Sequence, residues 1–156
     1  MKFTDLLERD SPVISFELFP PRYERGMAEL EARLPKLVDL EPSFISVTYG
    51  AMGTTRETTL ALASKIKNLY GQATAHHLTC VGSSRDEITG MLEDIRRNNI
   101  DNIIALRGDP PRGETGFTAA RDGFGHANEL VEHIQDFDGF GIAVAGYPEK
   151  HLEAPD

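Results

Sequence analysis

The sequence predicts an α/β fold built on a parallel sheet, and two features of the chain support this prediction. Short β-branched or aliphatic runs alternate with segments of helical period, an order that requires parallel strands joined by right-handed crossovers. Within the runs, every second residue is small or polar, while the opposite set is apolar. A doubly wound sheet is usually apolar on both faces, so the difference favours a (β/α)8 barrel over a doubly wound sheet.

The predicted strands are each too short for a buried helix. They are Val13–Leu18, Phe44–Thr48, Ala73–Cys80, Ile103–Arg107 and Gly141–Ala145. A (β/α)8 barrel has eight strands and rarely has fewer than ~200 residues, whereas this chain has 156. We therefore expect residues 1–156 to be the N-terminal portion of a single barrel, covering about its first five strands, with no separate second domain.

Helices are predicted between the strands. Two begin with S/T-x-x-E capping boxes, formed by Thr54 with Glu57 and by Ser84 with Glu87. Gly71 is expected to end the first of these two helices. The segment Gly26–Leu40 is amphipathic but contains Pro35, which removes a backbone donor, so we expect a kink or an early break. Apolar residues at helical spacing mark the last two helices: Ile88, Met91, Leu92 and Ile95, then Ala127, Leu130, Val131 and Ile134.

Side-chain alternation assigns each strand residue to one of two faces. The set assigned to the ligand side is Ser15 and Glu17; Ser46 and Thr48; Ala75, His77 and Thr79; Ala105, Arg107 and Asp109; Ala143, Ala145 and Tyr147. The set assigned to packing under helices is Ile14, Phe16, Leu18, Ile45, Val47, Ile104, Leu106, Ile142 and Val144. Barrel enzymes place their chemistry at the carboxyl ends of the strands. The first set has its polar members at those ends, which indicates a catalytic site.

Composition and charge narrow the classes of function. The chain has 16 Lys and Arg against 25 Asp and Glu, a net charge of −9, and no basic run of the kind that binds nucleic acid. No apolar run approaches the ~18 residues of a membrane span, and the start of the chain does not resemble a signal peptide. Cys80 is the sole cysteine, which excludes an internal disulfide and fits a reducing compartment. We expect a soluble, cytoplasmic protein without nucleic-acid or membrane partners.

Two strand ends carry candidate chemistry. Glu17 stands among apolar neighbours, so desolvation should raise its pKa towards use as a general acid. The alternative for Glu17 is a structural ion pair with a cation such as Arg22. Arg107 and Asp109 place a cation and an anion on one strand face, and the fork of the Arg107 guanidinium suits a phosphate or a ring carbonyl. Their alternative is an internal ion pair.

His76 and His77 are adjacent, so in a strand they point to opposite faces and cannot chelate one metal together. No metal site is expected. His77 is assigned to ligand contact, and His76 is expected to pack against helices or to be exposed. The chain has neither G-x-G-x-x-G nor a P-loop, so any dinucleotide must bind another way. The glycine-rich segment Gly113–Gly125 predicts a loop over the barrel mouth, either a lid or a disordered loop.

Five strand-end segments occur in order: SFELFPPR, FISVTYGAMG, AHHLTC, IIALRGDPP and VAGYPEKH. From about Val13 to its last residue, the chain resembles 5,10-methylenetetrahydrofolate reductase. The resemblance implies a (β/α)8 barrel that binds FAD without a Rossmann fold, in agreement with the face assignment and the missing glycine fingerprint. It also implies ping-pong chemistry, in which NADH or NADPH reduces FAD and the flavin then reduces methylenetetrahydrofolate to 5-methyltetrahydrofolate. For the full-length protein we expect a homo-oligomer.

The resemblance also implies the roles of individual residues. Glu17 matches the acid that protonates the bridging nitrogen of the folate, and Asp109 matches an aspartate near the flavin and folate. Thr48 matches a position near the nicotinamide. Contacts to the flavin are implied for Tyr49, Ala51, His77, Arg107, Gly108, Ala127, Tyr147, His151 and Ala154. The position before Ala127, usually tyrosine in the family, is His126 here, which puts aromatic stacking there in doubt.

The family continues beyond the fifth strand with further contacts to flavin, folate and nicotinamide. We therefore expect residues 1–156 alone to be inactive. A competing hypothesis is a non-catalytic half-barrel module that a partner chain completes. An unrelated barrel lyase or isomerase is disfavoured by the five motifs in order.

Overall fold

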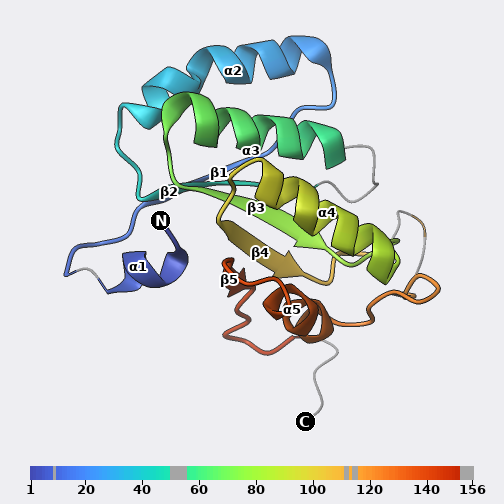
Figure 1. Cartoon of the computed structure of the whole chain (residues 1–156). Helices are drawn as coiled ribbons and strands as arrows, with labels where there is room; N and C mark the ends of the chain where they lie inside the picture. The colour runs from blue at the N-terminus through green and yellow to red at the C-terminus, as the bar shows by residue number, and fades with distance from the viewer. Residues whose placement is uncertain (9, 50–55, 111–112, 114–115, 152–156) are drawn as a thin grey trace.

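A computed structural model describes residues 1–8, 10–49, 56–110, 113 and 116–151. Five parallel strands form one sheet in the order of the chain (Figure 1). The strands are β1 (Ser15–Leu18), β2 (Phe44–Val47), β3 (Thr74–Thr79), β4 (Asn102–Leu106) and β5 (Gly141–Val144). The helices are α1 (Phe3–Leu7), α2 (Glu24–Val38), α3 (Arg56–Tyr70), α4 (Arg85–Arg97) and α5 (Ala127–Gln135).

The strand order decides between the two architectures that the sequence leaves open. Every strand pairs in parallel with its predecessor, so right-handed crossovers place all the connecting helices on one face. Figure 1 shows α2, α3, α4 and α5 following one another along that face. A doubly wound sheet reverses its order at a switch point. The sheet is therefore the first part of a (β/α)8 barrel, and the predicted fold class is confirmed.

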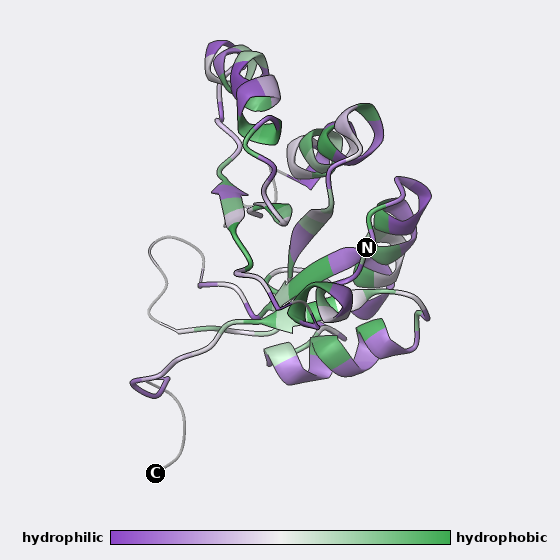
Figure 2. Ribbon diagram, turned by 90° about the vertical axis from the view of Figure 1, so that its left-hand side faces the viewer, coloured by the Kyte–Doolittle hydropathy of each residue, from purple (hydrophilic) through white to green (hydrophobic). Residues whose placement is uncertain are grey.

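The main core lies between the sheet and this helical layer. Ile45, Leu78 and Ile103 of the strands are completely buried against the apolar faces of the helices. In Figure 2 the strands carry hydrophobic stretches interrupted by hydrophilic ones, and the helices carry hydrophobic and hydrophilic residues in alternating bands. Each fully buried aliphatic side chain contributes about 1.5–3 kcal/mol relative to exposure. The predicted helix faces are confirmed, since the structure buries Ile88, Met91, Leu92, Ile95, Leu130 and Ile134.

The helix ends can be compared with the predicted capping boxes, the terminating glycine and the break at Pro35. At the start of α4, Glu87 N donates to Ser84 Oγ (3.3 Å) and Ser84 N to Glu87 Oε2 (2.8 Å), which confirms that capping box. Gly71 follows α3 with φ of +67°, as expected of a terminating glycine. The predicted early break at Pro35 is wrong, because α2 continues to Val38. Pro35 lies close to the end of that helix, where few hydrogen bonds depend on it. Thr54 lies outside the described residues.

The other face of the sheet is covered at its amino end by α1, which the sequence did not indicate. Phe3 and Leu6 form a second apolar cluster with Ala75, joined by Phe44, Ile104 and Ala143. The rings of Phe3 and Phe44 meet edge to face at 5.0 Å. α1 therefore closes the amino end of the barrel interior.

The register corrects the face assignment of β4. Ile104 lies beside His77 and Ala143, on the inner face, and Ala105 lies beside Leu78, under the helices. The alternation predicts the ligand side for Ala105 and Arg107 and the helix side for Ile104 and Leu106, and this prediction is wrong. The error arose because Ile103–Leu106 is apolar at every position, so alternation carries no information there. Ile104 is apolar because it packs with the cluster that α1 completes.

Among the described residues, no helix is both long enough and apolar enough to cross a membrane.

Candidate functional site

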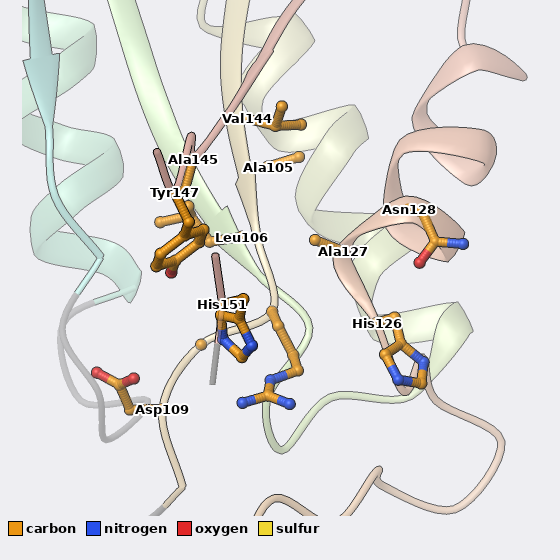
Figure 3. A pocket seen from close by; sticks show the side chains of 12 residues that line it. Ala105, Leu106, Asp109, His126, Ala127, Asn128, Val144, Ala145, Tyr147 and His151 are labelled. Atoms are coloured by element: carbon orange, nitrogen blue, oxygen red, sulfur yellow. The ribbon is translucent and has the colours of Figure 1, made fainter. Parts of the chain in front are cut away.

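A cavity of about 530 Å³ opens at the carboxyl ends of β4 and β5, beside the start of α5 (Figure 3). It falls within the usual range of small-molecule sites, ~300–1,000 Å³. Six residues that the sequence selected line it: Arg107, Gly108, Asp109, Ala127, Tyr147 and His151. Figure 3 shows that Tyr147 and His151 lie together, that Asp109 projects from the loop after β4, and that His126 and Asn128 approach from α5. The cavity thus joins three segments that are distant in sequence.

The turn after β4 is held by backbone geometry. Gly108 has φ of +88°, and a Cβ there would lie 2.7 Å from Val81 Cγ1, so a side chain would be strained and would clash. Val81 N (3.0 Å) and Cys80 Sγ (3.3 Å) both donate to the carbonyl of Arg107. Burial raises the pKa of the Cys80 thiol to about 11, so it stays protonated and can donate. These contacts fix the backbone that carries Arg107 and Asp109.

The opposite wall is the first turn of α5. Gly125 N donates to Glu129 Oε2 at 2.8 Å, and His126 Nδ1 lies 3.4 Å from Glu129 Oε1. The hydrogen bond from Gly125, followed by that from His126, holds the pKa of the Glu129 carboxyl below its usual value. The carboxylate thereby caps the helix at its positive end and fixes Ala127 at the cavity.

The third wall follows β5. The rings of Tyr147 and His151 meet edge to face at 4.8 Å, and Lys150 N donates to the carbonyl of Tyr147 at 3.0 Å to close the turn between them. Tyr147 is 59% exposed. The cavity therefore has an accessible aromatic face opposite its charged wall, which is the turn that carries Arg107 and Asp109.

Glu17 and His77 form a separate pair on the inner face of the sheet. Glu17 Oε2 lies 3.4 Å from His77 Nε2, within ion-pair range but without the geometry of a hydrogen bond. Burial lowers the pKa of His77, and the Glu17 charge opposes this only in part, so the imidazole is neutral at pH 7. The Glu17 side chain is 47% exposed, so the described residues cover only about half of it. Its described partner is His77 rather than the Arg22 of the alternative hypothesis.

Three buried side-chain atoms of β3 lack a hydrogen-bond partner among the described residues: His76 Nδ1, His77 Nε2 and Thr79 Oγ1. Buried polar atoms are normally paired. His77 and Thr79 share the inner face, because the strand register places them beside Ile104 and Leu106. Sequence reasoning assigned Thr79 to this face but gave it no role. The signal was its place in the inward series that also contains His77.

Thr48 and Tyr49, the two residues that follow β2, contact the helical layer or the side chains beneath it. The Thr48 carbonyl accepts a hydrogen bond from Thr59 Oγ1 of α3 at 3.0 Å. The ring of Tyr49 lies 6.4 Å from that of His76, under the helical layer, and burial raises the Tyr49 pKa. The structure therefore does not bring the Tyr49 ring to Glu17 and His77. His76 is buried among the helices, one of its two expected positions, and burial lowers its pKa to about 3.

Two predicted contacts, Ala51 and Ala154, lie outside the described residues. Within the described part of the chain, no group of three or more His, Cys, Asp or Glu side chains is placed to hold a metal ion. The second half of the glycine-rich loop is fixed, because Arg85 N donates to the Asp122 carbonyl at 3.2 Å. A Cβ at Gly123 would lie 2.5 Å from the carbonyl oxygen of Ser83. These contacts hold the described second half of the loop against the segment before α4.

Comparison with known proteins identifies the family. The sequence pattern of methylenetetrahydrofolate reductase matches residues 2–156. The chain belongs to this family. It is 43% identical over 152 residues to "Methylenetetrahydrofolate reductase (NADH) 1" of Arabidopsis thaliana, a match covering 96% of this chain and 26% of the relative. It is 41% identical over 141 residues to the "5,10-methylenetetrahydrofolate reductase" of Salmonella typhimurium, covering 90% of this chain and 46% of the relative.

A yeast relative gives the same picture. "Methylenetetrahydrofolate reductase 2" of Saccharomyces cerevisiae is 35% identical over 165 aligned residues, which cover all of this chain and 28% of the relative. The chain thus spans between about a quarter and about half of the relatives it matches.

Proposed function

We propose that the chain provides the amino-terminal part of a flavin-dependent reductase that converts 5,10-methylenetetrahydrofolate to 5-methyltetrahydrofolate. The observation that carries the proposal is the family match over residues 2–156, together with the cavity that gathers six of the sequence-selected residues. NADH or NADPH is the proposed hydride source, and the name of the Arabidopsis relative, which specifies NADH, favours the first. We further propose a cytoplasmic protein that is a homo-oligomer at full length.

The cavity suits an extended anionic dinucleotide such as FAD. Arg107 supplies a guanidinium, which pairs well with phosphate oxygens. The first turn of α5 adds backbone N–H groups at the positive end of a helix. Tyr147 offers an exposed aromatic face. When bound, FAD would supply the redox chemistry, taking a hydride from the nicotinamide and passing it to the folate.

Asp109 would act on the flavin through its charge. Its carboxylate stands on the turn that Gly108 shapes, at the rim of the same cavity. A fixed anion beside a flavin disfavours the accumulation of further negative charge on the ring. Asp109 would thereby tune both hydride transfer and folate binding.

Glu17 would supply the proton that the folate needs. Reduction adds a hydride and a proton overall, and the proton would go from the Glu17 carboxyl to the bridging nitrogen as the ring opens. His77 Nε2, 3.4 Å from Glu17 Oε2, would orient that carboxyl as a neutral imidazole. Thr79 Oγ1, buried on the same face, would contact the ligand.

We propose that residues 1–156 alone are inactive. Glu17 is half exposed, and a proton donor works best where water is excluded. In the described residues, β1 and β5 each pair on one side only, so further strands could extend the sheet at both edges. This observation also favours a second candidate, a binding module that a separate chain completes.

The test uses the full-length protein that carries residues 1–156. It should copurify with FAD, seen in its visible absorbance, and should oxidise NADH or NADPH in the presence of methylenetetrahydrofolate. Asp109→Asn should change the flavin reduction potential while the protein stays folded. Absence of both flavin and folate-dependent oxidation would rule out the reductase and leave the binding module.

A further inference from the structure

The loop between β4 and α5 places an aromatic ring against Arg107, one of the residues that line the cavity. The guanidinium carbon of Arg107 lies 4.7 Å from the centroid of the Phe117 ring, within the range of a cation–π contact. Phe117 is half-buried and packs against the main core. Arg107 lines the cavity. Phe117 thus links the core to the cationic side chain of the site.

The segment that follows Phe117 in the loop is itself anchored. Gly123 N donates to the Ala120 carbonyl at 2.9 Å, and Ser84 and Gly123 form an isolated antiparallel bridge. Phe124 is fully buried, with the guanidinium carbon of Arg85 4.4 Å from its ring centroid. The loop that presents Phe117 is therefore anchored to the start of α4.

We propose that Phe117 is a positioning residue for Arg107, holding its guanidinium at the cavity wall where it meets the diphosphate of the bound dinucleotide. Stacking engages the face of a guanidinium, whereas its N–H donors lie in the plane and point sideways. A stacked arginine can therefore still present donors to phosphate oxygens. This inference rests on the proposed function, which supplies the diphosphate.

The effect is one of preorganisation. An arginine side chain has many rotamers, and ordering such a side chain on binding weakens affinity. With Phe117 in place, part of this ordering is complete before the ligand arrives. Loss of the ring should weaken binding of a diphosphate ligand by about three- to tenfold.

The experiment measures FAD affinity of the full-length protein, stripped of flavin, by fluorescence titration. Phe117→Leu keeps an apolar side chain but removes the π face, and Phe117→Tyr keeps both. We expect Phe117→Leu to bind FAD about three- to tenfold more weakly and Phe117→Tyr to bind within about twofold of the parent. The matched control is Phe137→Leu, which removes a similar ring 5.5 Å from Arg96 and should leave FAD affinity unchanged.

A double-mutant cycle separates positioning from packing. In an Arg107→Gln background, Phe117→Leu should have no further effect on FAD affinity, because the side chain it positions is gone. An equal loss in both backgrounds, or an equal loss in Phe117→Tyr, would overturn the inference. Should Phe117→Leu lower the thermal unfolding midpoint, Phe117→Met, which has a similar volume but an unbranched and more adaptable side chain, replaces it under the same criteria.

The outcomes also separate this inference from the proposed function. If the parent protein binds FAD and Phe117→Leu binds it equally well, the positioning role is wrong and the reductase proposal stands. If the parent protein binds no FAD, the proposed function fails and the inference fails with it.

Discussion

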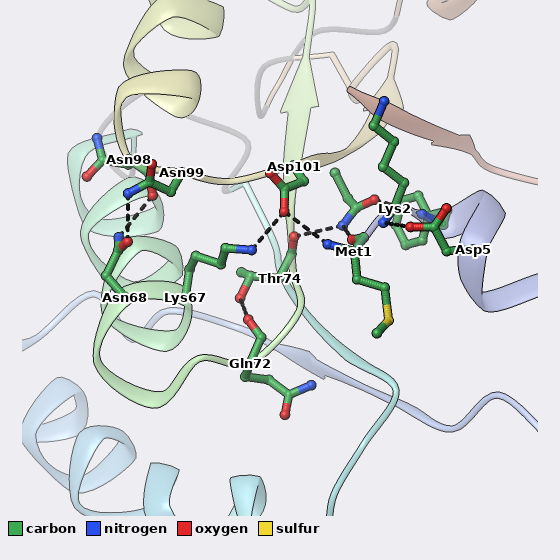
Figure 4. A network of polar contacts seen from close by, with 12 residues as sticks. Met1, Lys2, Asp5, Lys67, Asn68, Gln72, Thr74, Asn98, Asn99 and Asp101 are labelled. Carbon is green, nitrogen blue, oxygen red and sulfur yellow. Dashed lines mark hydrogen bonds and ion pairs between the residues drawn. The ribbon is translucent and has the colours of Figure 1, made fainter. Parts of the chain in front are cut away.

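At the amino end of the sheet, buried polar groups are hydrogen-bonded, whereas farther along β3 they are not. Asn102, 1% exposed, accepts from Phe3 N (2.9 Å) and donates to the carbonyls of Met1 (3.0 Å) and Thr74 (3.3 Å). Figure 4 shows the polar network at this end of the sheet, in which Lys67 and the amino terminus converge on Asp101. His76, His77 and Thr79 each keep one buried atom without a partner.

On the inner face, where His77 and Thr79 lie, this difference agrees with the proposed division of the barrel into a structural amino end and a functional carboxyl end. His76 faces the helices and does not bear on this division. An unpaired buried polar atom costs about 1–3 kcal/mol, so unpaired atoms persist where a ligand or a reaction requires them. In parallel barrels, the carboxyl end of the sheet carries the chemistry and the amino end carries stability. The division predicts which substitutions change activity and which change folding.

The largest expected effect is on activity at the carboxyl end. In the full-length enzyme, Glu17→Gln should lower the rate of folate reduction by about 10²–10⁴-fold, because the proton donor is lost. Its unfolding free energy should change by less than about 0.5 kcal/mol, since the side chain is half exposed. Steady-state kinetics and urea unfolding measure the two effects. Glu132→Gln, on the exposed side of α5, is the control, and a Glu17→Gln enzyme with more than a tenth of the parent rate would contradict the role.

The next effect is on stability at the amino end. Asn102→Ala should lower the unfolding free energy by about 2–3 kcal/mol, because it leaves the Phe3 amide and two carbonyls without their partner. Affinity for FAD should not change. Asn68→Ala is the matched control, since Asn68 also makes several hydrogen bonds but on an exposed surface, and should cost under about 1 kcal/mol. A loss of FAD affinity in Asn102→Ala would break the division between the two ends.

The unpaired His76 predicts acid sensitivity. Its folded pKa is about 3 and its unfolded pKa is about 6.5, so between these values the unfolded state binds more protons. Stability is therefore lost as the pH falls through this window, by up to about 1.4 kcal/mol per pH unit. His77, whose pKa is also lowered, acts in the same direction. Urea unfolding at pH 6.5, 6 and 5 should show a shallower pH dependence in His76→Leu, and an unchanged slope would show that His76 takes up its proton without unfolding.

The smallest expected effect is at the surface of the amino-end network. Burial raises the Asp101 pKa, but the Lys67 ammonium and the amino terminus outweigh it and hold the pKa below its usual value. The carboxylate therefore stabilises the fold above its unfolded pKa, and this contribution is lost as the pH falls through the lower folded value. Asp101→Asn should cost under about 1 kcal/mol at pH 7 and still less at pH 3. A destabilisation by Asp101→Asn that increases as the pH falls would contradict the predicted direction of the pH dependence.

The fold could be predicted from the sequence where the two faces of a helix or strand differ in polarity. The helices are amphipathic, so their buried residues could be read from spacing alone, as for Ile88 and Leu92. β4 is apolar on both faces, so its orientation depends on neighbours that periodicity cannot identify. α1 has only five residues, and its partners lie on strands far along the chain.

The candidate site was predictable to the extent that it lies at strand ends. Arg107, Asp109 and Tyr147 converge on one cavity because parallel strands end at the same edge. The environment of Glu17 was not predictable, since local apolar neighbours do not determine exposure. The role of Phe117 could not be predicted from the sequence, because its contact with Arg107 depends on how the loop folds back.

The packing of α1 depends on residues that the ribosome translates much later. Phe3 leaves the ribosome early, but Asn102, which binds its amide, follows 99 residues later. At about 5–20 residues per second, translation needs roughly 5 to 20 s to supply that partner. Phe3 and Leu6 are buried in the finished fold. Throughout this interval they stay exposed, because the strands they pack against are incomplete. The nascent segment that contains Phe3 and Leu6 is therefore a natural target for chaperones that bind exposed hydrophobic segments until β4 and β5 are made.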